Sequence, residues 1–140
     1  MSERIEAVKR AVEAFNRRDI DGLLELCDPE IEWSPPSDLP GSRTYHGHDG
    51  VREEIGDLTG IFADLQAEPV GFVEDGDRVI GFYIWRGHGA GSGIAVDAFE
   101  VEVGFICEFK GDLATSMRFF NGFEEAAQAA GIEDVPAKSG

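Results

Sequence analysis

The spacing of apolar residues changes from a helical period to a strand period near the middle of the chain. In the first part, apolar residues recur every three or four positions, as on one stripe of a helix: Ile5, Val8, Val12 and Phe15. From Leu65 onward, apolar and polar residues alternate in four runs: 65–74, 78–89, 94–110 and 113–120. Turn residues such as Asp75-Gly76 and Gly111-Asp112 separate these runs, so the sequence predicts helices followed by four consecutive antiparallel strands.

The first half predicts helices at 3–17 and Gly47–Phe62, with a short helix from Ile20 to Cys27 between them that ends before Pro29. The segment Glu30–Ser34 alternates and predicts a short strand. The stretch Pro35–Tyr45 is rich in proline, glycine and serine, which indicates a loop. Long loops of this kind in compact domains often have a function.

The end of the chain predicts one more helix. Asn121 with Glu124 three residues later resembles a capping box, and Gly131 follows Ala130 as a helix terminator. The length of 140 residues predicts one domain, over residues 1–132, followed by a flexible tail at 133–140. Helices followed by a meander predict an α+β fold, in which three helices cover one face of a strongly bent antiparallel sheet.

The charge balance excludes several classes of partner. Twelve basic and 28 acidic residues give a formal net charge of −16. Such a charge repels phosphate backbones and anionic lipid headgroups, so we expect no nucleic acid and no membrane partner. Residues 1–18 carry charges throughout and do not read as a secretory signal, which predicts a cytoplasmic protein. Cys27 and Cys107 have no metal-binding spacing and are expected to be reduced core residues.

Several segments resemble the nuclear transport factor 2-like superfamily, in its SnoaL-like and ketosteroid isomerase-like branch. The resemblance covers about residues 5–132. It rests on Ala14–Glu30, on Tyr45–Arg52 (Tyr-His-Gly-His-Asp-Gly-Val-Arg), on Gly89–Gly93, on Phe120–Ala126 and on Ala129–Gly131. These motifs specify the fold better than the chemistry, because this superfamily includes isomerases, cyclases, dehydratases, epoxide hydrolases and simple binding proteins.

The resemblance implies a cystatin-like curved antiparallel sheet wrapped around the N-terminal helices, forming a cone with an internal apolar pocket. It also implies pairing into a homodimer through the outer sheet face. The segment 82–85 agrees with this, because Tyr83 and Trp85 share one strand face while Phe82 and Ile84 share the other. One apolar face would meet the pocket, and the other would meet a partner subunit.

The catalytic residues of the relatives do not carry over. The ketosteroid isomerase tyrosine aligns with Ala11, the basic aspartate with Ser34, and the second acid with Val103. SnoaL-type cyclases carry an acid/base aspartate on the final strand, yet Leu113–Phe120 contains no carboxylate. The steroid isomerase machinery is therefore absent.

Two residues remain as candidate catalytic groups. Asp97 shares a strand face with Val103, and it would lie at the pocket rim, about 20 Å along the strand at roughly 3.3 Å per residue. Buried there, a carboxyl would have a raised pKa and could act as an acid or base. His46 or His88 could shuttle a proton near neutral pH. Asp97 and His46 are the foremost candidates, and for each of them a structural or solvated role stays open.

The remaining expectations concern the pocket and its contents. The residues expected to line the pocket are Phe15, Trp33, Tyr45, Tyr83, Trp85, Phe99, Val103 and Arg118. Arg118 could bind an anion or form an ion pair. No cofactor is expected, because the glycine-rich stretch 87–93 joins two strands and does not open a helix as a phosphate-binding loop must. No metal site is expected, because His46 and His48 flank a helix start without ligand spacing.

Three functions stay open at this stage. The chain could be an acid/base isomerase, cyclase or lyase acting on a small hydrophobic carbonyl compound. It could be a non-catalytic module that binds a small apolar ligand. A purely structural dimer would follow if Phe99, Val101, Phe105 and Phe109 filled the core.

Overall fold

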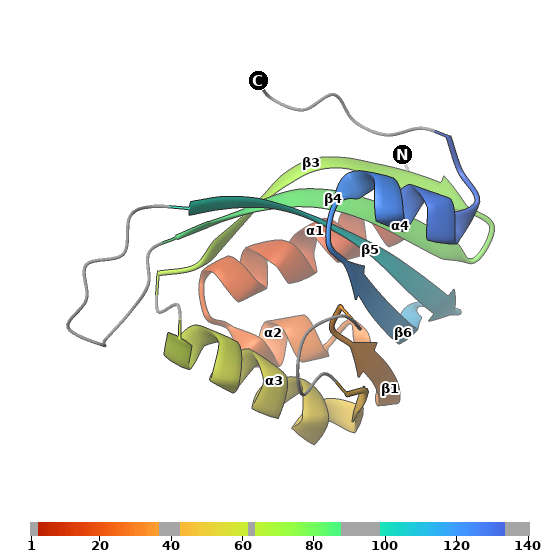
Figure 1. The fold of residues 1–140 in the computed structure, drawn as a ribbon. Coiled ribbons are helices and arrows are strands. Elements are labelled where there is room, and N and C mark those ends of the chain that lie inside the picture. Colours follow the sequence, from red (N-terminus) through yellow and green to blue (C-terminus); the bar gives the residue numbers. More distant parts are fainter. Residues whose placement is uncertain (1–2, 37–42, 62–63, 88–98, 134–140) are drawn as a thin grey trace.

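A computed structural model describes residues 3–36, 43–61, 64–87 and 99–133. The elements in chain order are α1 (Glu3–Asn16), α2 (Ile20–Leu24), β1 (Cys27–Ser34), β2 (Tyr45–His46), α3 (Gly47–Ile61), β3 (Gln66–Asp75), β4 (Arg78–Gly87), β5 (Phe99–Lys110), β6 (Leu113–Phe120) and α4 (Phe123–Ala130). Figure 1 shows α1, α2 and α3 together on one side of a curved sheet. The α+β architecture predicted from the change in period is confirmed.

The sheet has the strand order β2-β1-β6-β5-β4-β3. Strands β3 to β6 form the predicted antiparallel meander, with Tyr83 opposite Val103 in the β4–β5 pair. β1 extends this sheet by pairing with β6 in parallel, a contact between distant parts of the sequence. The short β2 then pairs with β1 as the last strand.

The segment around Cys27 differs from the sequence prediction. α2 ends at Leu24, and Cys27 belongs to β1, which begins three residues earlier than Glu30. The Asp19 carboxylate caps α2 by accepting a hydrogen bond from the Gly22 N–H at 3.1 Å. The β1–β6 register shifts between Cys27 and Glu32, and Pro29 lies inside this irregularity. Proline has no N–H to donate to a regular ladder, so within a sheet it is tolerated at an irregularity such as this one.

The inner face of the sheet is covered by α1 and α3. α1 buries one stripe, which includes Val8, Ala11, Ala14 and Phe15, as the sequence spacing predicts. The Asn16 side chain ties the end of this helix to β3 by donating to the Ala67 carbonyl at 2.9 Å and accepting from the Ala67 N–H at 2.8 Å. α3 covers β1 with Val51 and Ile55, which are both buried.

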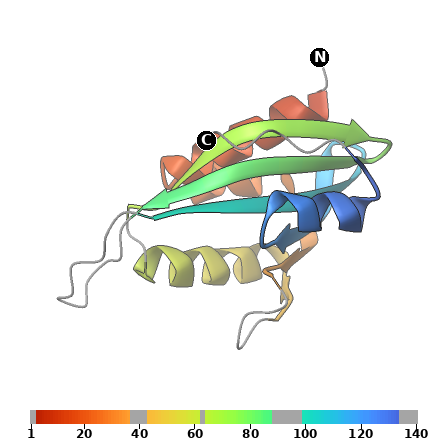
Figure 2. The same ribbon diagram turned by 45° about the horizontal axis from the view of Figure 1, so that its top comes forward.

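The outer face of the sheet is covered by α4, which Figure 2 shows on the side of the sheet away from α1. Phe82 of β4 is fully buried against Phe123 of α4, with ring centroids 5.4 Å apart in an edge-to-face arrangement. Ile80, Ile84 and Ile106 belong to the same cluster. Burying each such side chain contributes roughly 1.5–3 kcal/mol. The chain itself thus covers the face that suggested a partner subunit, and the homodimer stays a prediction.

The start of α4 also differs from the prediction. Gly122 occupies the N-cap position, and no side chain caps the helix. Asn121 precedes it, so Asn121 and Glu124 do not form a capping box. The end of the helix follows the prediction, because Gly131 adopts the left-handed conformation with φ of 73°. The predicted tail lies, apart from residue 133, outside the described residues.

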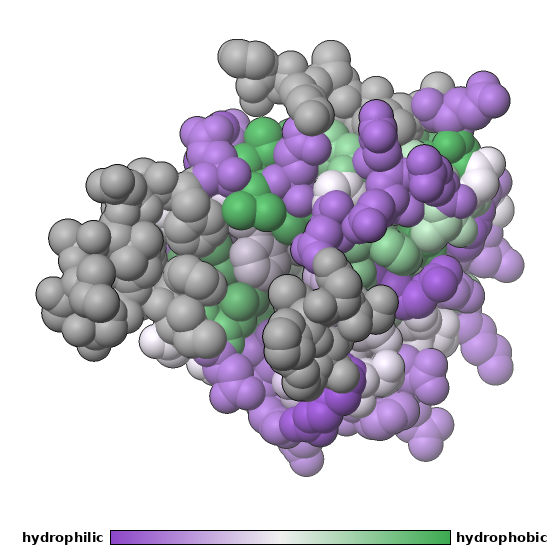
Figure 3. Space-filling model, viewed as in Figure 1, coloured by the Kyte–Doolittle hydropathy of each residue, from purple (hydrophilic) through white to green (hydrophobic). Residues whose placement is uncertain are grey.

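No helix in the described part of the chain is both long enough and apolar enough to span a bilayer. Figure 3 shows hydrophilic residues over much of one face, as expected from the acidic composition, with hydrophobic residues showing toward its middle.

The close approach of α4 to β5 gives a test of this packing. A Cβ at Gly104 would lie 2.3 Å from the Ala126 Cβ. We expect Gly104→Ala to destabilise the protein by about 1–3 kcal/mol, because α4 must move away from the sheet. The measurement is the free energy of unfolding in urea.

The control is Gly56→Ala in the exposed part of α3, where an added Cβ has no neighbour within 4 Å. This substitution should stabilise the protein by roughly 0.5–1 kcal/mol, because alanine is the better helix former. Equal stability of the Gly104→Ala variant and the wild type would contradict the close packing of α4.

Candidate functional site

A cavity of about 380 Å³ lies between the inner face of the sheet and the helices. Val8, Ala11 and Val12 of α1 line it from one side, and Val103 and Phe105 of β5 line it from the other. The core is therefore not filled by its own side chains. This argues against the third function considered above, a purely structural dimer with a filled core. The exposed residues Val101 and Asn121 also line the cavity. The cavity therefore reaches solvent where these two residues line it.

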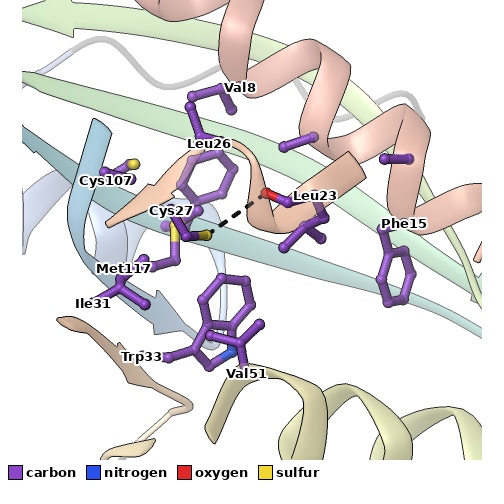
Figure 4. Packing of buried hydrophobic residues seen from close by; sticks show 14 of the residues in the cluster. Val8, Phe15, Leu23, Leu26, Cys27, Ile31, Trp33, Val51, Cys107 and Met117 are labelled. Carbon is purple, nitrogen blue, oxygen red and sulfur yellow. Dashed lines mark hydrogen bonds between the residues drawn. The ribbon is translucent and has the colours of Figure 1, made fainter. Parts of the chain in front are cut away.

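Aromatic rings form a continuous belt around the cavity. The ring centroids are separated by 6.4 Å for Phe15 and Trp85, 5.8 Å for Trp85 and Tyr83, 5.7 Å for Tyr83 and Phe105, 6.2 Å for Phe105 and Phe119, and 5.1 Å for Phe119 and Trp33. We call these six residues the ring belt. Most of its neighbouring rings meet at steep angles, which is a favourable arrangement for aromatic pairs. Figure 4 shows Trp33 directed from β1 into the core, beside Val51 of α3.

Glu54 of α3 is the one residue with a carboxyl side chain among the described residues that line this largely apolar cavity. Burial raises the pKa of Glu54 above its usual value of 4.5, and the nearby charge of Asp57 raises it further. The Trp33 indole N–H acts in the opposite direction, because it favours the ionised carboxylate. Among the described residues that line the cavity there is no lysine, arginine or histidine to serve as a counter-ion.

Tyr83 of β4 is the second acid that lines the cavity. Burial strongly raises the pKa of its phenol, and the charge of Glu54 adds to this, while the Trp85 indole N–H opposes it. Tyr83 therefore keeps its proton and can donate a hydrogen bond. Because the charge of Glu54 acts on Tyr83, the two acids belong to one site.

Two indole N–H groups of the site are buried without a well-formed hydrogen bond. The Nε1 atoms of Trp33 and Trp85 are inaccessible to solvent, and neither has a partner at hydrogen-bond geometry among the described residues. The Trp33 indole nevertheless lies close enough to Glu54 to lower the pKa of that acid, and the Trp85 indole lies close enough to Tyr83 to do the same there. Buried donors are satisfied in the great majority of cases, so this pair is unusual.

Five of the residues that the sequence predicts for the pocket line this cavity: Phe15, Trp33, Tyr83, Trp85 and Val103. Strand alternation places them there, since Val103 and Tyr83 are paired neighbours on the same face of the sheet.

Other predicted site residues lie elsewhere. Tyr45 packs against the edge of the core without lining the cavity, and the Arg43 guanidinium lies 4.2 Å from its ring centroid. His46 is exposed on β2, opposite Glu32 of β1, and does not line the cavity.

Arg118 faces away from the cavity, because its neighbours Met117 and Phe119 point into it. The Arg118 guanidinium lies 3.9 Å from the Glu108 carboxylate and 5.9 Å from the Phe120 ring centroid. Asp97, His88 and the side chain of Phe99 lie outside the described residues.

Sequence reasoning missed Glu54 as a site residue. The sequence gives one indication of it, namely its position on the helix. Glu54 lies three residues after Val51 and four before Leu58, which both belong to the predicted apolar stripe. A carboxylate on such a stripe either points away or enters the core. Only the placement of α3 over the cavity shows that Glu54 belongs to the site.

The structure offers neither a reactive thiol nor a metal centre in its described part. Both cysteines are free and buried, and burial raises the pKa of Cys27 to about 12 and also raises that of Cys107. The thiols therefore stay protonated at neutral pH. In residues 3–36, 43–61, 64–87 and 99–133 no three histidine, cysteine, aspartate or glutamate side chains gather as metal ligands.

Comparison with known families agrees with this architecture. A SnoaL-like domain matches residues 8–117, which is most of the chain. The chain belongs to the SnoaL-like domain family. This confirms the resemblance seen in the sequence. No curated protein matches the chain.

Several solved structures share the fold. An NTF2-like protein of unknown function from Burkholderia pseudomallei K96243 is 24% identical, with a TM-score of 0.78 over 91% of this chain and 97% of that one. TerC, co-crystallized with polyporic acid, is also 24% identical, with a TM-score of 0.74 over 91% and 99% of the two chains.

A third solved structure carries the ketosteroid isomerase-like description. It is a hypothetical protein from Catenulispora acidiphila DSM 44928 in complex with trimethylamine. It is 15% identical, with a TM-score of 0.72 over 91% of this chain and 94% of that one. Similar structures are also described as cystatin-like, so the predicted fold class is confirmed. At these identities the likeness shows the fold alone.

The raised pKa of Glu54 predicts a pH-dependent cost in stability. The folded protein holds this proton to higher pH than the unfolded chain, so stability falls as the pH rises through the range above 4.5. We expect Glu54→Gln to be more stable than the wild type at about pH 8 and nearly equal to it at about pH 4, because a neutral amide avoids the buried charge. Urea unfolding at both pH values measures the difference.

Glu53→Gln is the matched control, because Glu53 is adjacent on α3 but exposed, where it pairs with Arg43. Its effect should stay within about 1 kcal/mol at both pH values. A stability difference for Glu54→Gln that does not change with pH would show that Glu54 titrates normally.

Proposed function

We propose that the cavity binds a small, largely apolar molecule and that Glu54 transfers a proton to or from a carbonyl compound held there. The observation that carries this proposal is a single carboxyl with a raised pKa in a ring-lined cavity. A carboxyl whose pKa is moved toward neutral pH is a better general acid or base than an ordinary surface glutamate. TerC and the trimethylamine-bound protein, which share the fold, were crystallised with small molecules, and this supports a small-molecule role.

The proposed step is proton removal from the carbon next to a carbonyl group. The Glu54 carboxylate takes the proton, and the electron pair of the broken C–H bond moves to the carbonyl oxygen, giving an enolate. Return of the proton to the same carbon gives exchange with solvent, and its return to another carbon gives isomerisation. The apolar ring belt excludes water around the intermediate and strengthens each electrostatic contact to it.

Asp97 and His46 remain alternative proton carriers in this proposal. His46 has no place in the cavity wall, which favours Glu54 over it. The positions that align with the catalytic residues of ketosteroid isomerases, Ala11, Ser34 and Val103, carry no acid or base. The lack of acid/base residues at these positions favours the second candidate function, a non-catalytic module that binds the same class of ligand.

Exchange of the C2 hydrogens of 1-tetralone in D₂O tests the proposal. We expect the wild type to catalyse this exchange, with a rate that rises with pH as Glu54 ionises. Glu54→Gln should lower the rate roughly 100-fold or more, because general base catalysis contributes about 10²–10⁴-fold. NMR of the C2 position measures the rate.

The control Glu53→Gln should leave the rate unchanged. A wild type that binds 1-tetralone without accelerating exchange would identify a binding module. Exchange that survives in Glu54→Gln would transfer the role to another residue, with Asp97→Asn and His46→Gln as the next variants.

A further inference from the structure

The ionised form of Glu54 is a negative charge without a counter-ion in a wall of aromatic rings. Its side chain is half-buried and lines the cavity, so a ligand in the cavity can reach it. No lysine, arginine or histidine lines the cavity in the described part of the chain. The nearby charge that acts on Glu54, that of Asp57, is also negative. The site therefore lacks a positive charge, and a ligand can supply one.

We infer that the cavity binds small hydrophobic amines in their protonated form, with the ammonium group paired with the Glu54 carboxylate and packed against the rings beside it. This goes beyond the proposed function, on which it rests only in using the same cavity and the same carboxylate. It concerns the binding of a cation and needs no proton transfer to or from carbon. An amine held in this way occupies the place of the carbonyl compound and inhibits its exchange.

The rings that lie near Glu54 favour a cation at this place. The Trp33 indole lies close enough to Glu54 to affect its pKa, and the charge of Glu54 acts on Tyr83. An ammonium group against the carboxylate therefore lies near both of these members of the ring belt. Tryptophan and tyrosine rings attract a cation that lies over their faces within about 6 Å of the ring centroid. The hydrocarbon part of the amine packs against the remaining rings.

The charge distribution of the chain favours a cation over an anion. The net charge of −16 attracts cations to the protein and repels anions. Inside the cavity, a carboxylate ligand would meet Glu54, and two like charges in one site repel each other. An ammonium ion gives up part of its hydration on entry, and the carboxylate and the rings replace it. The pairing also stabilises the ionised form of Glu54, which burial otherwise disfavours.

Three ligands that share one carbon skeleton test the inference by isothermal titration calorimetry at about pH 8, where an aliphatic amine keeps its proton. They are 2-aminotetralin, 2-tetralol and tetralin-2-carboxylate, which carry an ammonium, a neutral hydroxyl and a carboxylate at the same carbon. We expect the wild type to bind the ammonium at least about tenfold more tightly than the alcohol, because only the ammonium adds a charge pair and a cation–ring contact. The carboxylate should bind most weakly. An ammonium-to-alcohol affinity ratio near one or below would overturn the inference.

Glu54→Gln removes the charge and nearly keeps the size of the side chain. It should bring the ammonium-to-alcohol ratio close to one or below, because a neutral amide does not pair with a cation. Glu53→Gln is the matched control, since it removes an exposed carboxylate that pairs with Arg43, and it should keep the ratio of the wild type. Both ligands are measured on the same variant, so a partial loss of folded protein cancels from the ratio. A high ratio that survives in Glu54→Gln would overturn the inference.

Deuterium exchange of 1-tetralone separates this inference from the proposed function. If the wild type selects the ammonium and also catalyses exchange, both proposals stand, and 2-aminotetralin should inhibit the exchange competitively. Exchange that continues when the amine is bound would place the amine elsewhere and overturn the inference. If the wild type selects the ammonium but catalyses no exchange, the inference stands and proton transfer fails. If it catalyses exchange with a ratio near one, proton transfer stands and the inference fails.

Discussion

The two apolar faces of β4 are the constraint on which the rest of the structure depends. Successive side chains of a strand point to opposite sides of the sheet, so Phe82 and Tyr83 need separate covers. The chain covers the outer face with α4, a helix that comes from the far end of the sequence, and covers the inner face with α1, α2 and α3. The outer contact is close, because Gly104 lets Ala126 approach the sheet. The inner contact leaves a cavity.

The cavity follows from the sizes of the side chains that face each other. α1 presents small residues such as Ala11 and Val12 toward the large rings of the sheet. Neighbouring rings of the belt pack against one another, most of them at steep angles, and the helices do not fill the remaining space. Glu54 enters this space from α3, where burial raises the pKa of its carboxyl. An uncompensated buried carboxyl costs stability, and such costs are typical of functional sites.

Sequence patterns predicted the parts of this architecture that depend on local periodicity. Alternation placed Tyr83 and Trp85 on one face of β4 and Phe82 and Ile84 on the other, and the structure has them there. The parallel pairing of β1 with β6 was not predictable, because no local signal joins segments so far apart in the chain. The apolar outer face was read as a subunit interface for the same reason: the sequence could not show that α4 folds back over it.

The sequence by itself determined the order of helices and strands, the face on which each side chain of a strand lies, and the apolar character of the pocket wall. These properties depend on the 3.6-residue and two-residue periods of the backbone, which neighbouring residues reveal. Only the tertiary structure decided that Glu54 belongs to the cavity while His46 and Arg118 lie outside it. The reason is physical: the protonation of a carboxyl and the pairing of an indole depend on burial and on neighbours from other elements, which exist only once the helices have packed against the sheet.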